Sequence, residues 1–323
     1  MRRDVTDSEI DGIEGWFTGT DKALFRFFLS ARDLGGDVAE LGAYLGKSAA
    51  LIGAYVRPGE TFTVIDLFGA NPGDDENADE NTGQYPGLSQ ERFEQNYRRI
   101  HGELPVVVRA PSSQITASAS HGTHRFVHID ASHLYEHVVG DVEAARTLLA
   151  PDGVVVFDDY RSEHTPGVAA VVWGEVAGGL HVLVTTSHKL YATWGDPGPW
   201  REALDAWLPT SGLEHERQTV AEQEVVRVWP AGTTAISFRI PSRLVPYIVR
   251  ARMGLATGQH AIGQAFGRLR RQRPARRHLS AQAEPSAKAQ PSAKAHPSRE
   301  AHPSPQAQAS PDAQPSPEPS RSV

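Results

Sequence analysis

The sequence predicts an α/β fold, namely a doubly wound, mostly parallel sheet with helices on both faces. Strand-like and helix-like segments alternate strictly along residues 38–194. The strand-like segments are almost continuously apolar, as in "TFTVIDLFG" and "GVVVFDDY", which is typical of parallel strands covered on both faces. Polar residues follow five of these strands. Ligands of such sheets bind beyond the carboxyl ends of the strands, so we expect a site there.

The individual elements follow from apolar periodicity and segment length. Strands are predicted at residues 38–42, 61–69, 105–110, 125–130 and 153–160, with a strand pair within 181–194. Helices are predicted at residues 47–56, 91–100, 137–150 and 167–177. We expect cap helices in residues 1–35, so that the main domain spans residues 36–230.

Composition changes sharply after residue 230. Residues 231–323 hold 14 basic against 4 acidic residues, whereas residues 1–230 hold 18 against 35. An acidic body does not suit the phosphate backbone, so no nucleic-acid partner is expected. Residues 231–279 are predicted as a basic helical extension that docks on the body, on a partner or on an anionic surface, or stays solvated; a homo-oligomer through it is also open. Residues 280–323 contain six degenerate hexapeptides rich in Pro, Ala and Ser, which predict a disordered tail.

The composition also excludes several classes. The chain has no cysteine, which excludes disulfides, thiolate catalysis and cysteine zinc sites. It has no apolar run long enough for a transmembrane helix. The start "MRRDVTDSEIDGIEGW" lacks an apolar signal core. A cytoplasmic location is therefore expected.

The stretch "ELGAYLGKS" carries a glycine turn between a strand and a helix, with Glu40, Gly42, Gly46 and Ser48 as its marked positions. Gly42 permits a sharp turn and a close backbone approach to a ligand. Gly46 and Ser48 fall at the helix start, where free N–H groups accept polar or anionic ligand atoms. The spacing matches neither the dinucleotide motif G-x-G-x-x-G nor a P-loop.

Asp66 ends the next strand, 26 residues after Glu40. An acid at this position suits a ribose diol, so the glycine turn and Asp66 together indicate an adenosine-containing cofactor. NAD-dependent Rossmann-like oxidoreductases share these features and stay an alternative. The alternative role for Asp66 itself is a helix cap.

Three carboxylates are expected to converge at the same edge. Asp130 ends the fourth strand, and Asp158 and Asp159 end the fifth, 28 and 29 residues later. The helix at 137–150 returns the chain for a parallel neighbour, so these ends meet. Clustered negative charge is unfavourable without a cation, and hard oxygen ligands favour Mg²⁺, or Ca²⁺ or Mn²⁺. The alternative is a set of solvated caps and turn residues.

Histidines surround Asp130 in "FVHIDASHLYEH". His133 is a candidate base, and its alternative is a loop-packing role. His133, Glu136 and His137 also spell H-x-x-E-H, the inverted zinc-protease motif. That motif belongs inside a helix, whereas here it begins just after a buried strand, so we do not favour it. His128 lies within the strand and is expected to point away from the site.

The polar stretch at residues 70–90 is unusually long for a connection. With Trp16, Phe17 and Tyr85 it is expected to form a lid over the acceptor. A disordered surface insertion is the alternative.

Taken together, these motifs resemble class I S-adenosylmethionine (SAM)-dependent methyltransferases, in particular the metal-dependent small-molecule O-methyltransferases that include catechol and macrolide-sugar enzymes. The resemblance covers roughly residues 12–230, and the block at 126–160 is its most specific part. It rests on the segments "GIEGWFTGTDKALFRFFL", "VAELGAYLGKS", "FTVIDLFG", "HIDASHLYEHVVGDVEAARTLLAPDGVVVFDDY" and "PGVAAVV". The resemblance implies a Rossmann-like sheet of seven strands.

For the cofactor, the resemblance implies that Glu40 and Gly42 border the methionine part of SAM. It further implies that Asp66 binds the ribose hydroxyls, and that Ser113 and Gln114 contact the adenine. For the metal it implies an acid after strand four, Asp130, and an acid pair after strand five, Asp158 and Asp159. It also implies that the histidine at position 133 is the base. Asp130 is further expected to take part in catalysis with His133 and to contact the cofactor.

The sequence thus predicts methyl transfer from SAM to a hydroxyl of a small molecule, a sugar or a natural-product scaffold. In this hypothesis Mg²⁺ lowers the pKa of the acceptor hydroxyl, His133 takes its proton, and an in-line displacement follows. An oxidoreductase would need a hydride-transfer site, and no Tyr-x-x-x-Lys pair occurs. A non-catalytic protein with this fold is the remaining alternative.

Overall fold

The computed structural model describes residues 4–70 and 87–232, which belong to a compact unit spanning Met1–Phe238. Most of the polar stretch at 70–90, including Tyr85, lies outside the described residues. So do almost all of the basic extension at 231–279 and the whole tail at 280–323. The lid, the docking helix, the homo-oligomer and the disordered tail therefore stay predictions.

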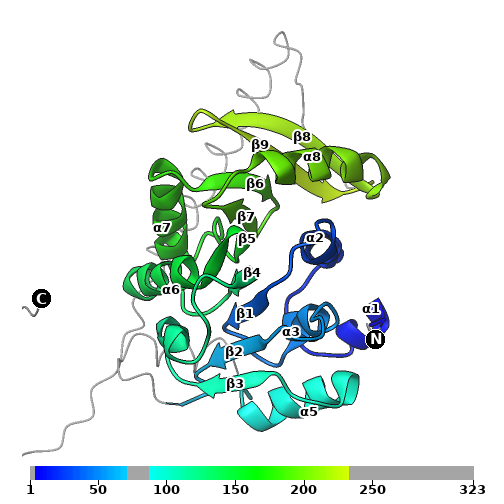
Figure 1. The fold of residues 1–323 in the computed structure, drawn as a ribbon, viewed down its shortest axis with the longest axis vertical. Coiled ribbons are helices and arrows are strands. Elements are labelled where there is room, and N and C mark those ends of the chain that lie inside the picture. Colours follow the sequence, from blue (N-terminus) through cyan, green and yellow to red (C-terminus); the bar gives the residue numbers. More distant parts are fainter. Residues whose placement is uncertain (1–3, 71–86, 233–323) are drawn as a thin grey trace, which may run out of the picture. The chain divides into compact units, whose positions relative to one another are not determined.

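The centre of the fold is one sheet of nine strands in the order β3-β2-β1-β4-β5-β7-β6-β9-β8 (Figure 1). The strands are β1 Asp37–Leu41, β2 Phe62–Asp66, β3 Val106–Arg109, β4 His124–Ile129, β5 Leu149–Phe157, β6 His181–Thr185, β7 Leu190–Thr193, β8 Leu213–Val220 and β9 Gln223–Pro230. The α/β fold is confirmed, but two strands more than the predicted seven are present. The extra hairpin escaped prediction because β8, "LEHERQTV", is exposed along almost its whole length and lacks an apolar face.

The strands β3, β2, β1, β4 and β5 pair in parallel, and β7 runs antiparallel to both β5 and β6. The chain first builds outward from β1 to β3 and then returns to place β4 on the other side of β1. The ends of β1 and β4 therefore flank the point where strand order reverses, which is where open α/β sheets bind ligands. In this register Glu40 lies beside His128, and His128 lies beside Val156.

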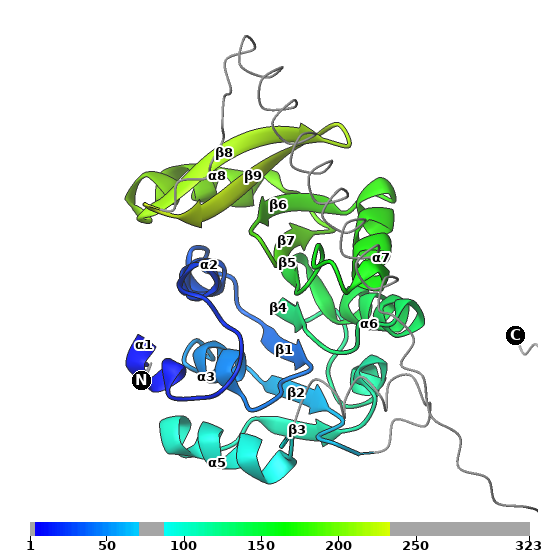
Figure 2. The same ribbon diagram turned by 180° about the vertical axis from the view of Figure 1, so that it is seen from behind.

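Helices cover both faces of the sheet (Figures 1 and 2). They are α1 Asp7–Asp11, α2 Gly19–Ser30, α3 Lys47–Gly53, α5 Gln90–His101, α6 Tyr135–Leu148, α7 Pro166–Ala177 and α8 Gly198–Trp207, with the short 3-10 helices η1 Ser112–Ala117 and η2 Leu208–Thr210. Within the described residues, no helix combines the length and the apolar character that a membrane crossing requires.

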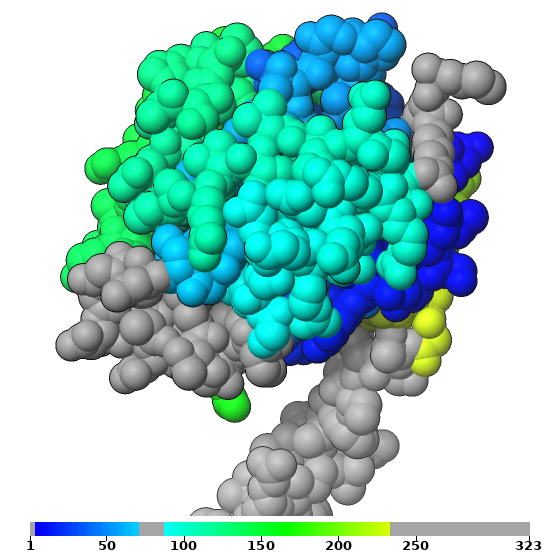
Figure 3. Space-filling view, turned by 90° about the horizontal axis from the view of Figure 1, so that it is seen from below, coloured from blue at the N-terminus to red at the C-terminus, as the bar shows by residue number. Residues whose placement is uncertain are grey.

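Side-chain alternation along the strands feeds two separate cores. Val38 and Val64 pack with α2, α3, α5 and α8 on one face. Ala39 and Ile65, their chain neighbours, pack with α6 and α7 on the other. Figure 3, the view from below, shows that the cyan residues of the chain, which include α5 and β3, form much of this surface. Because both faces are buried, the strands read as continuous apolar runs, as predicted.

The start of α2 is fixed by a capping box. The Thr18 hydroxyl accepts from the Asp21 backbone N–H, and the Asp21 carboxylate accepts from the Thr18 backbone N–H at 2.9 Å. A cap of this kind stabilises a helix by about 1 kcal/mol. It also sets the position of the preceding residues 15–17, which reach the site described next.

Candidate functional site

A pocket of about 660 Å³ opens at the carboxyl edge of the sheet. Its walls come from residues 15–21, from the glycine turn and α3, from the loops after β4 and β5, and from the β6–β7 hairpin. Of the predicted site residues, those that line this pocket are Ser48, Asp130, His133, Asp158 and Asp159. Those that do not line it are Glu40, Gly42, Gly46, Asp66, Ser113 and Gln114.

The glycine turn has a structural reason for each glycine. Gly42 has φ +81°, and a Cβ there would lie 1.9 Å from the Asp130 carbonyl oxygen. Gly46 has φ +88°, caps α3, and a Cβ would lie 3.0 Å from the Phe93 ring. What approaches Gly42 this closely is the backbone at the end of β4, so the glycine sets the distance between the ends of β1 and β4. The helix begins at Lys47, as predicted.

Asp66 fastens the end of β2 to the glycine turn. Its Oδ2 accepts from the backbone N–H groups of Ala43 and Tyr44 at 2.8 and 3.0 Å, and its Oδ1 accepts from Phe68 at 2.7 Å. Burial raises the pKa of Asp66, although these three hydrogen bonds oppose the rise. A carboxylate offers about four lone-pair positions, so one position is left for another donor. Ribose binding by Asp66 stays a prediction.

The predicted adenine contacts lie apart from the pocket. Ser113 and Gln114 are exposed on η1, the 3-10 helix that follows β3. The Gln114 backbone N–H donates to the Pro111 carbonyl at 2.9 Å, which shapes the first turn of η1. Their contact with adenine stays a prediction.

Glu40 and His128 form a fully buried pair. The His128 Nδ1 lies 2.9 Å from the Glu40 Oε1, and both side chains are inaccessible to solvent. The other carboxylate oxygen of Glu40, Oε2, has no hydrogen-bond partner among the described residues. His128 is buried, and the expectation that it points away from the site is wrong. Residues i and i+2 of a strand share a face, so His128 projects on the same side as Asp130.

Lys189, in the hairpin between β6 and β7, is a site residue that sequence reasoning missed. Its side chain is 2% exposed and forms an ion pair with Asp158. Its Nζ lies 3.5 Å from the His128 Nε2 and 5.9 Å from the centroid of the Phe17 ring. Since an ammonium group only donates, Nε2 of His128 accepts, and the Nδ1 proton is then directed to Glu40. Glu40, His128, Lys189 and Asp158 thus form one continuous buried chain.

The buried ionisable groups Lys189, Asp158 and Asp130 have pKa values that are shifted in different directions. Burial opposes the charged form of Lys189, but the neighbouring acids, Asp158 first, outweigh it and raise the lysine pKa. Burial likewise opposes ionisation of Asp158, but the Lys189 ammonium outweighs it and lowers the pKa of Asp158 overall. For Asp130, burial and then the charge of Asp158 raise the pKa well above the usual value. The group therefore contains an ammonium–carboxylate pair, Lys189 with Asp158, beside a second carboxyl group, Asp130, whose pKa is raised.

The predicted metal ligands do not come together as a set of three. Among the described residues, the ligand atoms of Asp130 and Asp158 gather with a nitrogen of His128, all within 4.8 Å of one another. Asp159 instead accepts from the Ser162 hydroxyl at 2.5 Å. Asp158 is engaged on both oxygens, by the Asp159 backbone N–H at 2.8 Å and by the Lys189 ammonium. This donor set does not fit a divalent ion as it stands, because its ligand atoms are in use and a cation is already among them.

His133 lies in the loop between β4 and α6, and its Nε2 is 3.4 Å from the Asp159 Oδ2. Burial of Asp159 is outweighed by the donors of His133 and Ser162, which lower the pKa of Asp159 to about 2. Asp159, which is ionised at neutral pH, therefore orients the imidazole of His133. A histidine held by a carboxylate at the wall of a pocket is the usual arrangement of a general base.

The inverted zinc-protease motif is not formed. His133 precedes α6 and turns to Asp159, whereas the Nδ1 of His137 lies 3.0 Å from the Ser132 hydroxyl. Glu136 is exposed. Among the described residues, neither His133 nor His137 belongs to a group arranged to hold a metal.

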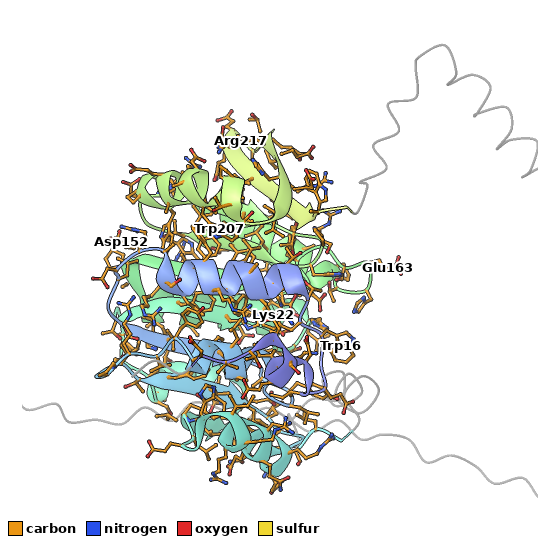
Figure 4. The ribbon with its side chains drawn as sticks, turned by 90° about the vertical axis from the view of Figure 1, so that its right-hand side faces the viewer. Trp16, Lys22, Asp152, Glu163, Trp207 and Arg217 are labelled. Carbon is orange, nitrogen blue, oxygen red and sulfur yellow. The ribbon has the colours of Figure 1, made fainter. Side chains whose placement is uncertain are left out.

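Residues 15–17 line one side of the pocket. Trp16 is 73% exposed, and its ring centroid lies 5.8 Å from that of Tyr44. Lys47 donates to the Gly15 carbonyl at 2.9 Å and so ties this segment to α3. Figure 4 shows Trp16 and Glu163 at one edge of the molecule and Asp152, which lies in the first half of β5, toward the other. Trp16 therefore stands at the carboxyl edge of the strands, on the rim of the pocket.

Comparison with protein families gives one match, in which residues 39–160 fit the model described as a methyltransferase domain. This range runs from β1 to the end of β5 and the start of the next loop. No curated protein sequence matches the chain significantly.

Several solved structures resemble the chain at low sequence identity. The O-methyltransferase NovP is 20% identical, with 55% of this chain and 81% of that chain covered and a TM-score of 0.44. The methyltransferase PaMTH1 of Podospora anserina, bound to S-adenosylhomocysteine, is 14% identical, with 59% and 89% covered and a TM-score of 0.41. A putative O-methyltransferase from Klebsiella pneumoniae is 11% identical, with 59% and 92% covered and a TM-score of 0.42.

Proposed function

We propose that this chain, whose residues 39–160 form a methyltransferase domain, transfers the methyl group of SAM to a hydroxyl of a small molecule. One observation carries the proposal. A single pocket joins the glycine turn and the start of α3 to the His133–Asp159 pair. A cofactor seated on the turn and an acceptor seated against the histidine would therefore share one cavity.

For the cofactor, we assign Glu40, Gly42 and Asp66 to the methionine and ribose parts of SAM, and Ser113 and Gln114 to the adenine. The buried Oε2 of Glu40, which has no partner among the described residues, supports the first assignment because it is suited to accept from an amino group. Gly46 and Ser48 complete the turn at the start of α3. The sulfonium of bound SAM supplies an electrophilic methyl group.

The acceptor hydroxyl needs a base, and His133 is our candidate. With the Nε2 proton of His133 directed to Asp159, Nδ1 carries the lone pair that takes the hydroxyl proton. The ionised Asp159 then stabilises the imidazolium that forms. The acceptor oxygen attacks the methyl carbon, the carbon–sulfur bond breaks, and the products are a methyl ether and S-adenosylhomocysteine. Positioning of the two reactants in the pocket supplies the rest of the acceleration.

Mg²⁺, expected from the sequence, is left out of this reaction because the donor atoms around Asp158 already hold the Lys189 ammonium. For the acceptor we propose a polyhydroxylated molecule, a sugar or a natural product that carries one. The pocket offers it His133, His164, Ser162 and the exposed ring of Trp16. Hydroxyl-rich ligands use such polar groups for orientation and aromatic faces for contact.

Calorimetry with the full chain tests the cofactor, and a mass-shift screen of hydroxylated acceptors with SAM tests the transfer. We expect binding of both SAM and S-adenosylhomocysteine. Replacement His133→Ala should lower kcat by about 10²–10⁴-fold and leave S-adenosylhomocysteine binding unchanged, because a positioned base contributes that much. His215→Ala, at an exposed histidine of β8, is the matched control. Failure to bind either nucleoside, or full activity of His133→Ala, would contradict the proposal.

A further inference from the structure

The geometry points to Lys189 as a counter-ion built into the chain, which takes the place of a divalent metal at this methyl-transfer site. The inference rests on the proposed function. It concerns the carboxyl groups after β4 and β5, where the sequence predicts three acids and a metal, and where the structure has an ammonium group instead.

The lysine is held in place by its hairpin. The Lys189 backbone N–H donates to the Thr186 hydroxyl at 2.8 Å, and the Thr186 backbone N–H donates to the Lys189 carbonyl at 2.9 Å. These two bonds close the tight turn between β6 and β7, which are both buried strands. The ammonium is therefore delivered from a rigid element rather than from a loop.

Burial makes a chance placement implausible on energetic grounds. A charged group removed from water costs several kcal/mol unless it is paired and hydrogen-bonded. Lys189 is 2% exposed and meets Asp158, His128 and the face of Phe17. Removing either partner of such a pair leaves an uncompensated buried charge, which is strongly unfavourable. The lysine and Asp158 therefore require each other.

The atoms that could ligate a divalent ion already have other partners, so binding of the ion would require these side chains to rearrange. Mg²⁺ takes near-octahedral oxygen ligands at about 2.1 Å, and Ca²⁺ takes six to eight. Asp158 already accepts from Lys189 and from the Asp159 backbone, and both ring nitrogens of His128 are engaged. Asp159 is committed to Ser162 and His133. An ion could enter only if Lys189 left and Asp158 turned.

The ammonium can do part of what a metal does. Lys189 is one of the residues that line the pocket, so its positive charge, paired with Asp158, belongs to the wall of the space in which we place the acceptor. A positive charge near a hydroxyl favours the alkoxide, and a fixed charge pays no reorganisation at the moment of reaction. Transfer by this route is independent of added metal.

Mn²⁺ titration followed by electron paramagnetic resonance tests the inference on the full chain, with S-adenosylhomocysteine present. The wild type should bind no Mn²⁺ up to about 1 mM. Lys189→Ala should gain one bound Mn²⁺ with a dissociation constant below about 0.1 mM, because it exposes two adjacent carboxyl groups without their cation. Adding Asp158→Asn to Lys189→Ala should abolish that gain. Lys22→Ala, at a second buried lysine paired with Asp11 at 2.9 Å, is the matched control and should behave as wild type.

Two results would overturn the inference: Mn²⁺ binding by the wild type that Asp158→Asn removes, or no gain of Mn²⁺ by folded Lys189→Ala. If Lys189→Ala does not fold, Mn²⁺ binding by the wild type and by Asp158→Asn is compared instead. The inference holds if the wild type binds no Mn²⁺ and fails if it binds Mn²⁺ that Asp158→Asn removes. Calorimetry of S-adenosylhomocysteine on the same samples separates this result from the proposed function. If the chain binds S-adenosylhomocysteine and also binds Mn²⁺ at Asp158, only the inference about Lys189 is contradicted. If it binds neither S-adenosylhomocysteine nor Mn²⁺, the methyl-transfer proposal is contradicted.

Discussion

Asp159 shows how one residue serves both geometry and charge. It adopts φ +51°, an uncommon backbone conformation outside glycine that aspartate tolerates better than most residues, and this turns its side chain from Asp158 toward His133 and Ser162. The result is two adjacent acids with separate tasks. Asp158 pairs with the lysine, and Asp159 orients the histidine.

The depressed pKa of Asp159 predicts a loss of stability in acid. The pKa is about 2 in the folded chain, so the contribution is fully present above the unfolded value near 4 and is lost as the pH falls toward 2. We expect Asp159→Asn to remove about 1 kcal/mol of this pH dependence, since the partly exposed group is screened by solvent. Urea unfolding at several pH values between about 2 and 6 measures it. If the free energy of unfolding depends on pH in the same way for the wild type and for Asp159→Asn, the pKa of Asp159 is not lowered by folding.

Asp141 predicts a dependence of the opposite sign. It lies on α6 in the core, and burial, only partly offset by the Ser112 hydroxyl, raises its pKa to about 7. Between about pH 4 and 7 the unfolded chain ionises this acid while the folded chain keeps it protonated, so stability falls as the pH rises through that window. We expect Asp141→Asn to be more stable than wild type at pH 8 by on the order of 2 kcal/mol.

The matched control for Asp141→Asn is Glu143→Gln, an exposed acid on the same helix. Its unfolding curves should show no such dependence on pH. Equal effects of both substitutions, measured by urea unfolding, would show that burial of Asp141 is not the cause.

At the scale of elements, the carboxyl ends of β1 and β2 are joined through Asp66. The residues that donate to it include Tyr44 and Phe68, both with positive φ, so one carboxylate holds two left-handed turns that aromatic residues rarely adopt. Such turns cost about 1–3 kcal/mol each and persist only where neighbouring contacts determine them. Asp66 is therefore a support of the turn as well as a proposed cofactor ligand.

Replacement Asp66→Asn should lower the free energy of unfolding by about 1–3 kcal/mol, because an amide nitrogen cannot accept from the backbone N–H groups. Thermal unfolding with and without S-adenosylhomocysteine measures both roles, since ligand binding raises Tm only if the site survives. Asp33→Asn, at a fully exposed acid, is the control and should change little. A stable Asp66→Asn chain that has lost only ligand binding would show that the carboxylate does not support the turn.

For the whole molecule, the parallel strands and the glycine turn were predictable because the information is local. Apolar runs mark buried strands, and Gly42 and Asp66 stand at strand ends. The β8–β9 hairpin was not predictable from apolarity, because β8 is exposed and its hairpin partner supplies only a few buried residues, such as Val225, Val226 and Val228. Lys189 was missed for a different reason. It meets Asp158 and His128 across 31 and 61 residues of sequence, and lysines are seldom buried.

Two truncations test this organisation. Deletion of residues 280–323, which the composition predicts to be a tail, should leave Tm unchanged within about 1 °C. Deletion from residue 213 onward also removes β8 and β9, and with them the buried Val226 and Val228, so Tm should fall by more than about 10 °C. Differential scanning calorimetry compares the two. A large loss of Tm in the shorter deletion would show that the tail contributes to the folded structure.

The buried chain from Glu40 through His128 and Lys189 to Asp158 determines where the positive charge of the site comes from. A metal centre is assembled after synthesis and depends on what ions the surroundings offer, whereas this counter-ion is translated with the polypeptide. Its stoichiometry is fixed at one per molecule, and chelation cannot remove it. Every correctly folded copy therefore carries the Lys189 ammonium at its pocket, whichever metal ions the surroundings contain.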